Sequence, residues 1–174
     1  MKTLIIYGTR YGSTTSYAER LAKKTGIEAV DYKDAKKIND YNKIIYLGAL
    51  YAGGVTGLKK TVSKMSSNQD LIIATVGLAD PTDSDNIKNI RNSIKNQIPP
   101  KFYDESKIFH LRGAIDYRRL GIKHKVMMSM LHSKVSKMPK SELNAEAKAM
   151  LETYGHKVDF IDFDALEQII NKMQ

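Results

Sequence analysis

The chain has 174 residues and a mass of 19.6 kDa, which suits one domain with a substantial hydrophobic core. Hydrophobic residues make up 42% and charged residues 27%, a globular composition, and the absence of cysteine excludes disulfides, thiolate metal sites and thiol nucleophiles. No apolar run approaches the roughly 18 residues of a membrane span, and the apolar stretch at the N-terminus is too short for a cleavable signal. We therefore expect a cytoplasmic protein.

The formal net charge of +9 is concentrated in one segment. Residues 101–140 hold 10 Lys and Arg but only 3 Asp and Glu, together with His110, His124 and His132. Such a segment favours an anionic partner, which leaves open nucleic acid, an acidic membrane surface on which the chain would sit peripherally, or a ligand with several carboxylates or phosphates. Nucleic acid is the least expected of the three, because the segment has few aromatic residues and no known nucleic-acid-binding motif.

Short apolar runs alternate with helical patterns over most of the chain. The apolar runs predict five strands, at residues 4–7, 27–31, 43–48, 70–76 and 107–111. Apolar spacing predicts helices at residues 14–24, 56–65, 86–97 and 164–173, with Ser13 as the N-cap and Gly26 as the stop of the first helix. This alternation predicts an α/β fold, with a doubly wound, five-stranded parallel sheet covered by helices on both faces.

Residues 113–160 depart from the alternation, and we expect them to form a basic helical insertion between the last strand and the last helix of a single domain, 1–174. Helices are predicted at residues 122–138 and 142–154. On the first of these, one side is mainly apolar and the other polar, which gives the sets Met127, Leu131, Val135, Met138 and Lys125, Ser129, His132, Ser136. The apolar side suits a flat apolar ligand or lipid, or packing on the domain. We expect His124 and His132 to be solvated or to face anions.

Ligands of open parallel sheets bind at the carboxyl ends of the strands, so the loops there are the candidate sites. The loop after the first strand, Gly8 to Thr14, offers three hydroxyls, two glycines and a helix N-terminus. This combination predicts a phosphate site, although an ordinary capped turn is the alternative. The loop contains neither a Walker A motif nor GxGxxG.

Two further loops reach the same edge of the sheet. After the third strand, Tyr51 lies between glycines, an arrangement that lets backbone approach a flat ligand while the aromatic ring stacks on it. A surface aromatic on a loop is the alternative. The loop after the fourth strand has Gly77 but no aromatic residue.

Several other chemistries are excluded by missing residues. The ends of the first and third strands lack the carboxylates that a receiver domain needs for Mg²⁺. GxSxG is absent, and the histidines lack the spacing of metal ligands, so we expect no nucleophile elbow and no metal site.

The motifs TRYGST, GALYAGG, TVGLAD and RGAIDYRR together resemble the flavodoxin family, and most closely its menaquinone-dependent protoporphyrinogen dehydrogenase branch. The resemblance implies a flavodoxin-like fold, FMN as cofactor, and a role in heme biosynthesis in which porphyrinogen is oxidised and a quinone accepts the electrons. It implies no catalytic side chain, because flavin N5 carries the chemistry. The implied FMN-binding residues are Thr9, Arg10, Tyr11, Gly12, Ser13, Thr14, Ala49, Leu50, Tyr51, Ala52, Gly53, Gly54, Thr75, Val76, Gly77, Leu78, Ala79 and Asp80.

The basic insertion would decide what the flavin reacts with. We expect Arg112, Arg118, Arg119 and Lys123 to meet a carboxylated substrate or an anionic membrane, with a solvated surface as the alternative. The third loop lacks the second flavin-stacking aromatic of many flavodoxins, and the chain is basic where typical flavodoxin electron carriers are acidic. Both departures favour an enzyme. A flavodoxin-type electron-transfer protein without its own substrate is the alternative function.

Overall fold

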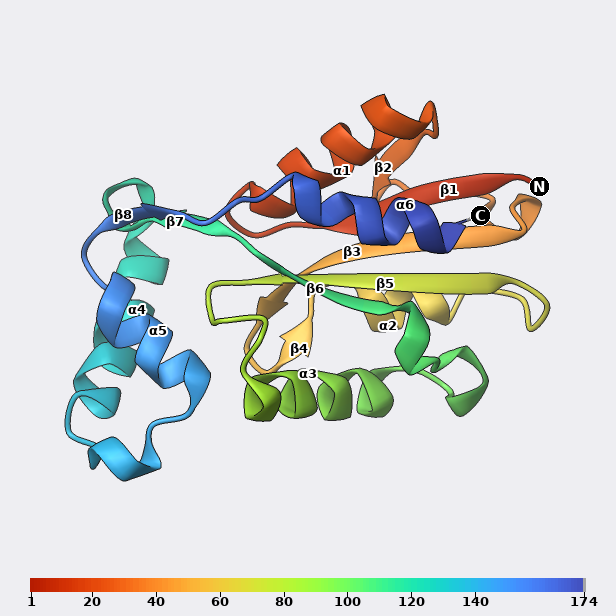
Figure 1. Cartoon of the computed structure of the whole chain (residues 1–174). Helices are drawn as coiled ribbons and strands as arrows, with labels where there is room; N and C mark the ends of the chain where they lie inside the picture. Colours follow the sequence, from red (N-terminus) through yellow and green to blue (C-terminus); the bar gives the residue numbers. More distant parts are fainter. Residues whose placement is uncertain (174) are drawn as a thin grey trace.

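The computed structural model describes residues 1–173, in which a central sheet lies between two layers of helices (Figure 1). The strands are β1 (Thr3–Gly8), β2 (Ala29–Asp31), β3 (Lys43–Tyr51), β4 (Gly54–Val55), β5 (Asp70–Gly77), β6 (Ile108–Arg112), β7 (Ala114–Asp116) and β8 (Lys157–Asp159). The helices are α1 (Ser13–Thr25), α2 (Leu58–Val62), α3 (Ser84–Gln97), α4 (Ile122–Val135), α5 (Ala145–Thr153) and α6 (Glu167–Met173).

Five strands form the parallel part of the sheet in the order β2-β1-β3-β5-β6, and β4 adds to β3 as an antiparallel hairpin. The five main strands thus follow the doubly wound order 2-1-3-4-5, and the predicted fold class is confirmed. The register aligns Gly8 of β1 with Gly48 of β3 and with Thr75 of β5, so the loops after these strands meet at one edge.

Each face of the sheet has its own hydrophobic core because successive side chains of a strand point to opposite faces. In β3, Ile44 and Tyr46 pack on the side of α2 and α3, whereas Ile45 and Leu47 pack on the side of α1 and α6. All four side chains are fully buried. Both faces are buried in this way, which explains why the central strands appear in the sequence as continuous apolar runs.

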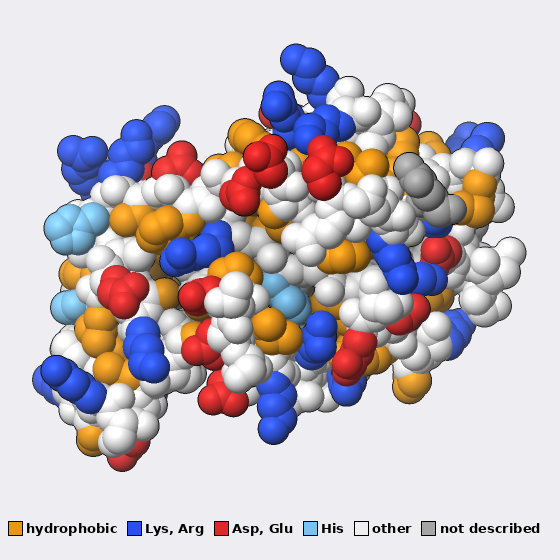
Figure 2. Space-filling model, viewed as in Figure 1, with side chains coloured by type: hydrophobic (Ala, Val, Ile, Leu, Met, Phe, Trp, Pro, Cys, Tyr) orange, Lys and Arg blue, Asp and Glu red, His pale blue; other side chains and the backbone are white. Residues whose placement is uncertain are grey.

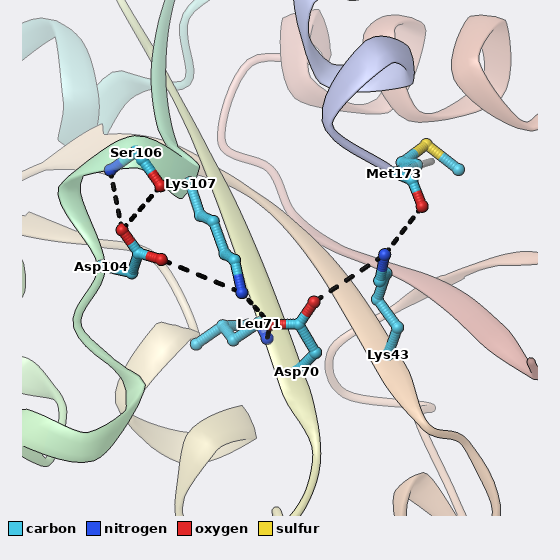
Figure 3. Close-up of polar contacts among 7 residues, drawn as sticks. All are labelled: Lys43, Asp70, Leu71, Asp104, Ser106, Lys107 and Met173. Atoms are coloured by element: carbon cyan, nitrogen blue, oxygen red, sulfur yellow. Dashed lines mark hydrogen bonds and ion pairs between the residues drawn. The ribbon is translucent and has the colours of Figure 1, made fainter.

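The opposite edge of the sheet, at the amino ends of the strands, is held by a chain of ion pairs (Figure 3). The Lys43 ammonium is buried, donates to the Met173 carbonyl at 2.8 Å and lies 3.8 Å from the Asp70 carboxylate. Lys107 donates to the same carboxylate at 2.6 Å. These contacts connect β3, β5, the start of β6 and the end of α6 far from the loops at the carboxyl ends.

Residues 113–160 form a separate lobe beyond the carboxyl ends of the strands, at the left of Figure 1. Strands β7 and β8 pair antiparallel at its base, with Ile115 opposite Val158. Its small core of buried side chains consists of Ile115, Tyr117, Leu120 and Met128. The lobe therefore has packing of its own.

Several predicted boundaries were wrong. Gly12, not Ser13, is the N-cap of α1, because its φ of 95° suits glycine. Helix α2 spans only Leu58–Val62, since the preceding residues form the β4 hairpin and a glycine turn. Strand β3 continues three residues past Gly48, because it pairs with both β4 and β5. The short strands β4, β7 and β8 were not predicted.

Candidate FMN site

The loop between β1 and α1 presents free backbone donors to the edge of the sheet. Gly12 donates its N–H to the Thr9 hydroxyl oxygen at 3.1 Å, which closes the loop over the start of α1. The N–H groups in the first turn of a helix have no partner in the preceding turn, and the first turn of α1 carries no acidic residue. Such a helix end favours an anion.

Thr14 supplies the most specific feature of this loop. Its side chain is 1% exposed, and its hydroxyl has no hydrogen-bond partner among residues 1–173. A buried hydroxyl without a partner costs free energy, and a ligand oxygen bound at the start of α1 would accept a hydrogen bond from it. The loop therefore fits the phosphate group of FMN.

The other side chains of this loop are used differently. The Ser13 hydroxyl donates to the Ala114 carbonyl at 3.1 Å and accepts from the Ala114 N–H at 2.8 Å, so its hydrogen bonds tie α1 to β7. Only its backbone N–H remains for a ligand. Arg10 and Tyr11 are exposed, and each contacts a neighbouring ring: Arg10 lies over Tyr51, and Tyr11 makes an edge contact with His124.

Tyr51 lies at the end of β3, next to a tight two-residue turn. The turn residues Ala52 and Gly53 both have positive φ, 49° and 75°, as hairpin turns of this length require. The Arg10 guanidinium lies 4.1 Å from the centre of the Tyr51 ring, and the Tyr51 hydroxyl donates to the Met127 sulfur at 3.5 Å. The half-buried ring is thus held from two sides.

The expectation that residues 49–54 form one loop was wrong for its first half. Ala49 is buried in β3, and Leu50 packs against the core beneath α3. A Cβ on Gly77 would lie 2.8 Å from a Leu50 methyl carbon, so a larger residue at position 77 would require the Leu50 side chain to shift. The side chains of Ala49 and Leu50 therefore pack into the core and do not face a ligand at the carboxyl edge of the sheet.

The third predicted segment is also partly internal. Thr75 is 1% exposed and its hydroxyl lies 2.8 Å from the His110 ring nitrogen Nδ1, while Val76 packs in the core beneath α1. The Asp80 carboxylate accepts from the N–H and hydroxyl of Thr82, and these hydrogen bonds hold the pKa of Asp80 below its ordinary value. The side chains of Thr75 and Val76 thus point into the molecule.

The four predicted cations differ in their surroundings. Arg112 donates twice to the Leu78 carbonyl, at 3.1 and 2.8 Å, and its guanidinium covers the Phe160 ring at 3.8 Å. It holds the third loop in place, and its expected contact with substrate or membrane stays a prediction. Arg118, Arg119 and Lys123 are exposed. The Arg118 side chain is 76% exposed, although its Nε lies 3.5 Å from Asp116.

Helix α4 lies over two of the site loops. The His124 ring makes edge contacts with Tyr11 at 5.7 Å and with Tyr51 at 6.4 Å. Met127 of α4 and Leu78 of the third loop are partly buried, and both pack against the core of the lobe. The insertion is therefore part of the wall of the candidate site.

The predicted surroundings of α4 need correction. Of its apolar side, Met127, Val135 and the nearby Met138 are half-buried, so that side mainly faces inward and only Leu131 is exposed. His124 and His132 are only partly exposed to solvent, because His124 contacts two tyrosines and His132 stacks on Tyr154 at 4.0 Å. The expectation that they face anions stays a prediction.

The most exposed apolar side chains of α4 are instead Ile122, Val126 and Met130. These three residues are four apart in the sequence, as expected for one face of a helix. The apolar set on the inner side is spaced equally regularly, so the pattern alone did not show which set is exposed. Which set faces inward depends on tertiary contacts of the lobe.

Two features are absent from residues 1–173. No group of three or more His, Asp or Glu side chains in this part of the chain is arranged to hold a metal ion. None of the helices formed by the same residues is long and apolar enough to cross a membrane.

Comparison with known proteins places the chain in a family. Residues 4–142 match the family model described as a flavodoxin domain. Among curated proteins, none matches significantly. Solved structures similar to the chain include a putative flavoprotein from Bacteroides uniformis, at 12% identity and a TM-score of 0.48, with 64% of this chain and 90% of that chain covered.

A flavoprotein in complex with FMN from Lactobacillus acidophilus is similar at 15% identity and a TM-score of 0.42, covering 64% of this chain and 90% of that chain. A flavodoxin bound to flavin mononucleotide from Fusobacterium nucleatum is similar at 19% identity and a TM-score of 0.38, covering 44% of this chain and 53% of that chain. Since the family model matches well over half of its residues, the chain belongs to the flavodoxin-domain family.

Proposed function

We propose that this protein is an FMN-dependent oxidoreductase that oxidises a carboxylated, porphyrinogen-like small molecule and passes the electrons to a quinone. Membership of the flavodoxin-domain family supports FMN as the cofactor. The single observation that carries this assignment in the structure is Thr14, whose buried hydroxyl lacks a partner among the described residues 1–173 at the start of α1.

The residues of the chain have distinct parts in this function. The first-turn N–H groups of α1 and the Thr14 hydroxyl would hold the phosphate. Tyr51 would contact the flavin ring, and Arg112 would fix the third loop through the Leu78 carbonyl. Bound FMN supplies two-electron redox chemistry at flavin N5, so no protein side chain has to act as a nucleophile or metal ligand.

Substrate oxidation, in place of simple electron carriage, is favoured by the lobe of residues 113–160. A carrier must expose its flavin edge to a protein partner, whereas α4 lies over Tyr51 and Tyr11. Exposed Arg118, Arg119 and Lys123 on this lobe suit the carboxylates of a small substrate. Each turnover would take two electrons and two protons from the substrate and give them to the quinone, which leaves as the quinol.

The test uses the full chain loaded with FMN under anaerobic conditions. We expect protoporphyrinogen to bleach the visible flavin absorption and a menaquinone analogue to restore it. Porphyrin should accumulate only with the analogue present, because its formation removes more electrons than the two that one flavin accepts. The dimethyl ester of the same porphyrinogen is the matched control, and it should react more slowly because it lacks the carboxylates.

The alternative reading, an electron-transfer flavodoxin, predicts a different outcome. Porphyrinogen would leave the flavin oxidised, while a flavodoxin reductase with NADPH would reduce it and an acceptor protein would reoxidise it. That result would remove the proposed substrate class and leave the FMN assignment intact.

A further inference from the structure

Helix α4 presents an apolar stripe that its own domain does not cover. Ile122 is 83% exposed, Val126 55% and Met130 70%. Residues four apart lie on one face of a helix, so these side chains form a continuous outward row that we call the α4 stripe. The side of the helix that faces the lobe carries Met128, which belongs to the core of the lobe, and Met127, which packs against that core.

Cations flank the α4 stripe on both sides. Helical geometry places Lys123 and Lys134 along one flank and Lys125 along the other. The helix contains no acidic residue. Figure 2 shows Lys and Arg side chains projecting from this lobe, with hydrophobic side chains between them.

A groove continues from the stripe toward the base of the lobe. It has a volume of about 570 Å³ and is lined by Tyr117, Arg118, Lys125, Val126, Ser129, Met130, Tyr154 and Gly155. Two members of the groove, Val126 and Met130, belong to the stripe, and two others are cationic. The groove thus offers apolar surface next to positive charge, the combination that an amphipathic anion requires.

Protein partners fit this surface less well than lipid. A stripe of three side chains on a helix of 14 residues, about 21 Å long, falls short of the roughly 800 Å² per partner of a standard protein interface. A second copy would also bring two lysine-flanked faces of a chain with a net charge of +9 together, which is repulsive.

We propose that the α4 stripe docks this protein on an anionic lipid bilayer. Ile122, Val126 and Met130 would enter the headgroup region, while the flanking lysines reach lipid phosphates at the level of the interface. Long lysine side chains can extend along an apolar surface and keep their ammonium groups at the polar boundary. Docking does not depend on the proposed substrate.

Docking also has a consequence for the candidate FMN site. The inward face of the same helix contacts Tyr11 and Tyr51, through His124 and Met127. One helix diameter, about 10 Å, would then separate the site from the lipids. If the proposed function is correct, the flavin edge would lie close to a quinone dissolved in the bilayer.

The first experiment measures binding of the full chain to vesicles by flotation. Phosphatidylcholine vesicles containing phosphatidylglycerol should bind it at least about tenfold more tightly than phosphatidylcholine alone. The triple variant Ile122→Ser, Val126→Ser, Met130→Ser should lose about tenfold or more in affinity. Its thermal unfolding should match that of the unmodified chain, because the three side chains are exposed.

Two double variants that remove the same charge distinguish the effect of the α4 lysines from the effect of the net charge of the protein. Lys123→Gln with Lys134→Gln should weaken binding about tenfold and reduce its salt dependence. The matched control, Lys36→Gln with Lys64→Gln, removes the same charge from exposed positions outside the lobe and should stay within about twofold. Equal loss in both pairs would overturn the proposal, because it would show a non-specific charge effect.

A second readout uses the absence of tryptophan from the chain. In the variant Ile122→Trp, anionic vesicles should shift the fluorescence to shorter wavelength, whereas Lys64→Trp should show no shift. The proposal is overturned if the unmodified chain does not float with anionic vesicles, if the triple serine variant binds them fully, or if the tryptophan at position 122 stays in water. It is also overturned if light scattering shows a dimer that the triple variant dissociates, which would assign the stripe to a second copy.

Discussion

The Thr14 hydroxyl has opposite effects on the stability of the free protein and on its affinity for FMN. Its buried hydroxyl lacks a partner within residues 1–173, so Thr14→Val should leave stability without FMN unchanged or higher. The same substitution removes a donor to a charged phosphate, a loss of about 1.5–3 kcal/mol, and should weaken FMN binding at least about tenfold. Flavin fluorescence titration and thermal unfolding check the two signs.

Ser16→Ala is the matched control for Thr14. The Ser16 hydroxyl donates to the Gly12 carbonyl at 3.3 Å, so its removal should change FMN affinity less than about twofold. If Thr14→Val and Ser16→Ala bind FMN equally well, the phosphate does not lie at the start of α1.

His110 makes stability depend on pH. Burial, and to a smaller extent the nearby Arg91 charge, lower the pKa of His110 from 6.5 to about 4. The unfolded chain therefore binds a proton between these values that the folded chain does not, so stability is fully present above about pH 6.5 and falls as the pH drops toward 4. The wild-type chain should lose about 2 kcal/mol from this group between pH 7 and pH 5.

The variant His110→Asn isolates this contribution, because Asn does not titrate and can still reach the Thr75 hydroxyl. Denaturant unfolding of both chains at pH 7 and pH 5 gives the difference. Wild type should lose more stability over this range than the variant, and equal losses would mean that His110 is not buried in its neutral form.

At the scale of elements, the amino ends of the strands stabilise the fold, whereas the carboxyl ends form the candidate site. The amino ends are joined by Asp70, which pairs with buried Lys43 and with Lys107. Asp70→Asn removes the carboxylate charge beside the buried Lys43 ammonium and should lower the free energy of unfolding by about 2–4 kcal/mol. Chemical denaturation measures the change.

Glu105→Gln is the control for Asp70, because Glu105 pairs with partly exposed Arg91 and Lys95 at 3.4 and 3.5 Å. Exposed pairs contribute little, so this change should stay below about 1 kcal/mol. Equal effects of the two substitutions would show that the buried position of Lys43 is unimportant. Neither should alter FMN affinity, since both lie far from the carboxyl edge of the sheet.

The lobe of residues 113–160 should control what the flavin reacts with, and the loops should control whether the flavin binds. Arg118→Ala with Arg119→Ala should therefore keep normal FMN content but slow porphyrinogen oxidation about tenfold, because two cations that suit carboxylates are lost. Stopped-flow flavin bleaching measures the rate. Loss of FMN from a folded double variant would place these arginines in the cofactor site, and an unchanged rate would leave them as solvated surface.

The strands and long helices were predictable because local pattern and tertiary burial agree there. Strand β5 is apolar through nearly all its length, and α3 has Ile90 and Ile94 on its buried side. The β4, β7 and β8 strands were not predictable, because two or three residues carry no measurable period and form only through pairing with a distant partner. The sequence also did not predict which side of α4 faces inward, because that helix has two apolar rows with similar spacing.

At the scale of the whole molecule, the order of the strands brings three separate loops to one edge. The sequence was sufficient to find these loops, because the end of each apolar run marks a carboxyl end of the sheet. It was not sufficient to distinguish side chains that face the edge from those that face the core, such as Leu50 and Thr75. That distinction depends on strand length and on the partner that pairs across the sheet.

Placing the lobe against the loops was also beyond the sequence. The contacts of Ser13 with Ala114, and of Tyr51 with Met127, join residues far apart in the chain. They make α4 part of the candidate site, which a pattern of charges could not show.

The central claim is that the edge formed by these loops is an FMN site, and a titration of the purified chain with FMN and with FAD tests it most directly. Flavin fluorescence and the visible spectrum should show one FMN per chain and much weaker binding of FAD, because the phosphate is held at the start of α1 and the described residues 1–173 provide no fold for a second nucleotide. No saturable binding of FMN, or equal affinity for FMN and FAD, would contradict the account.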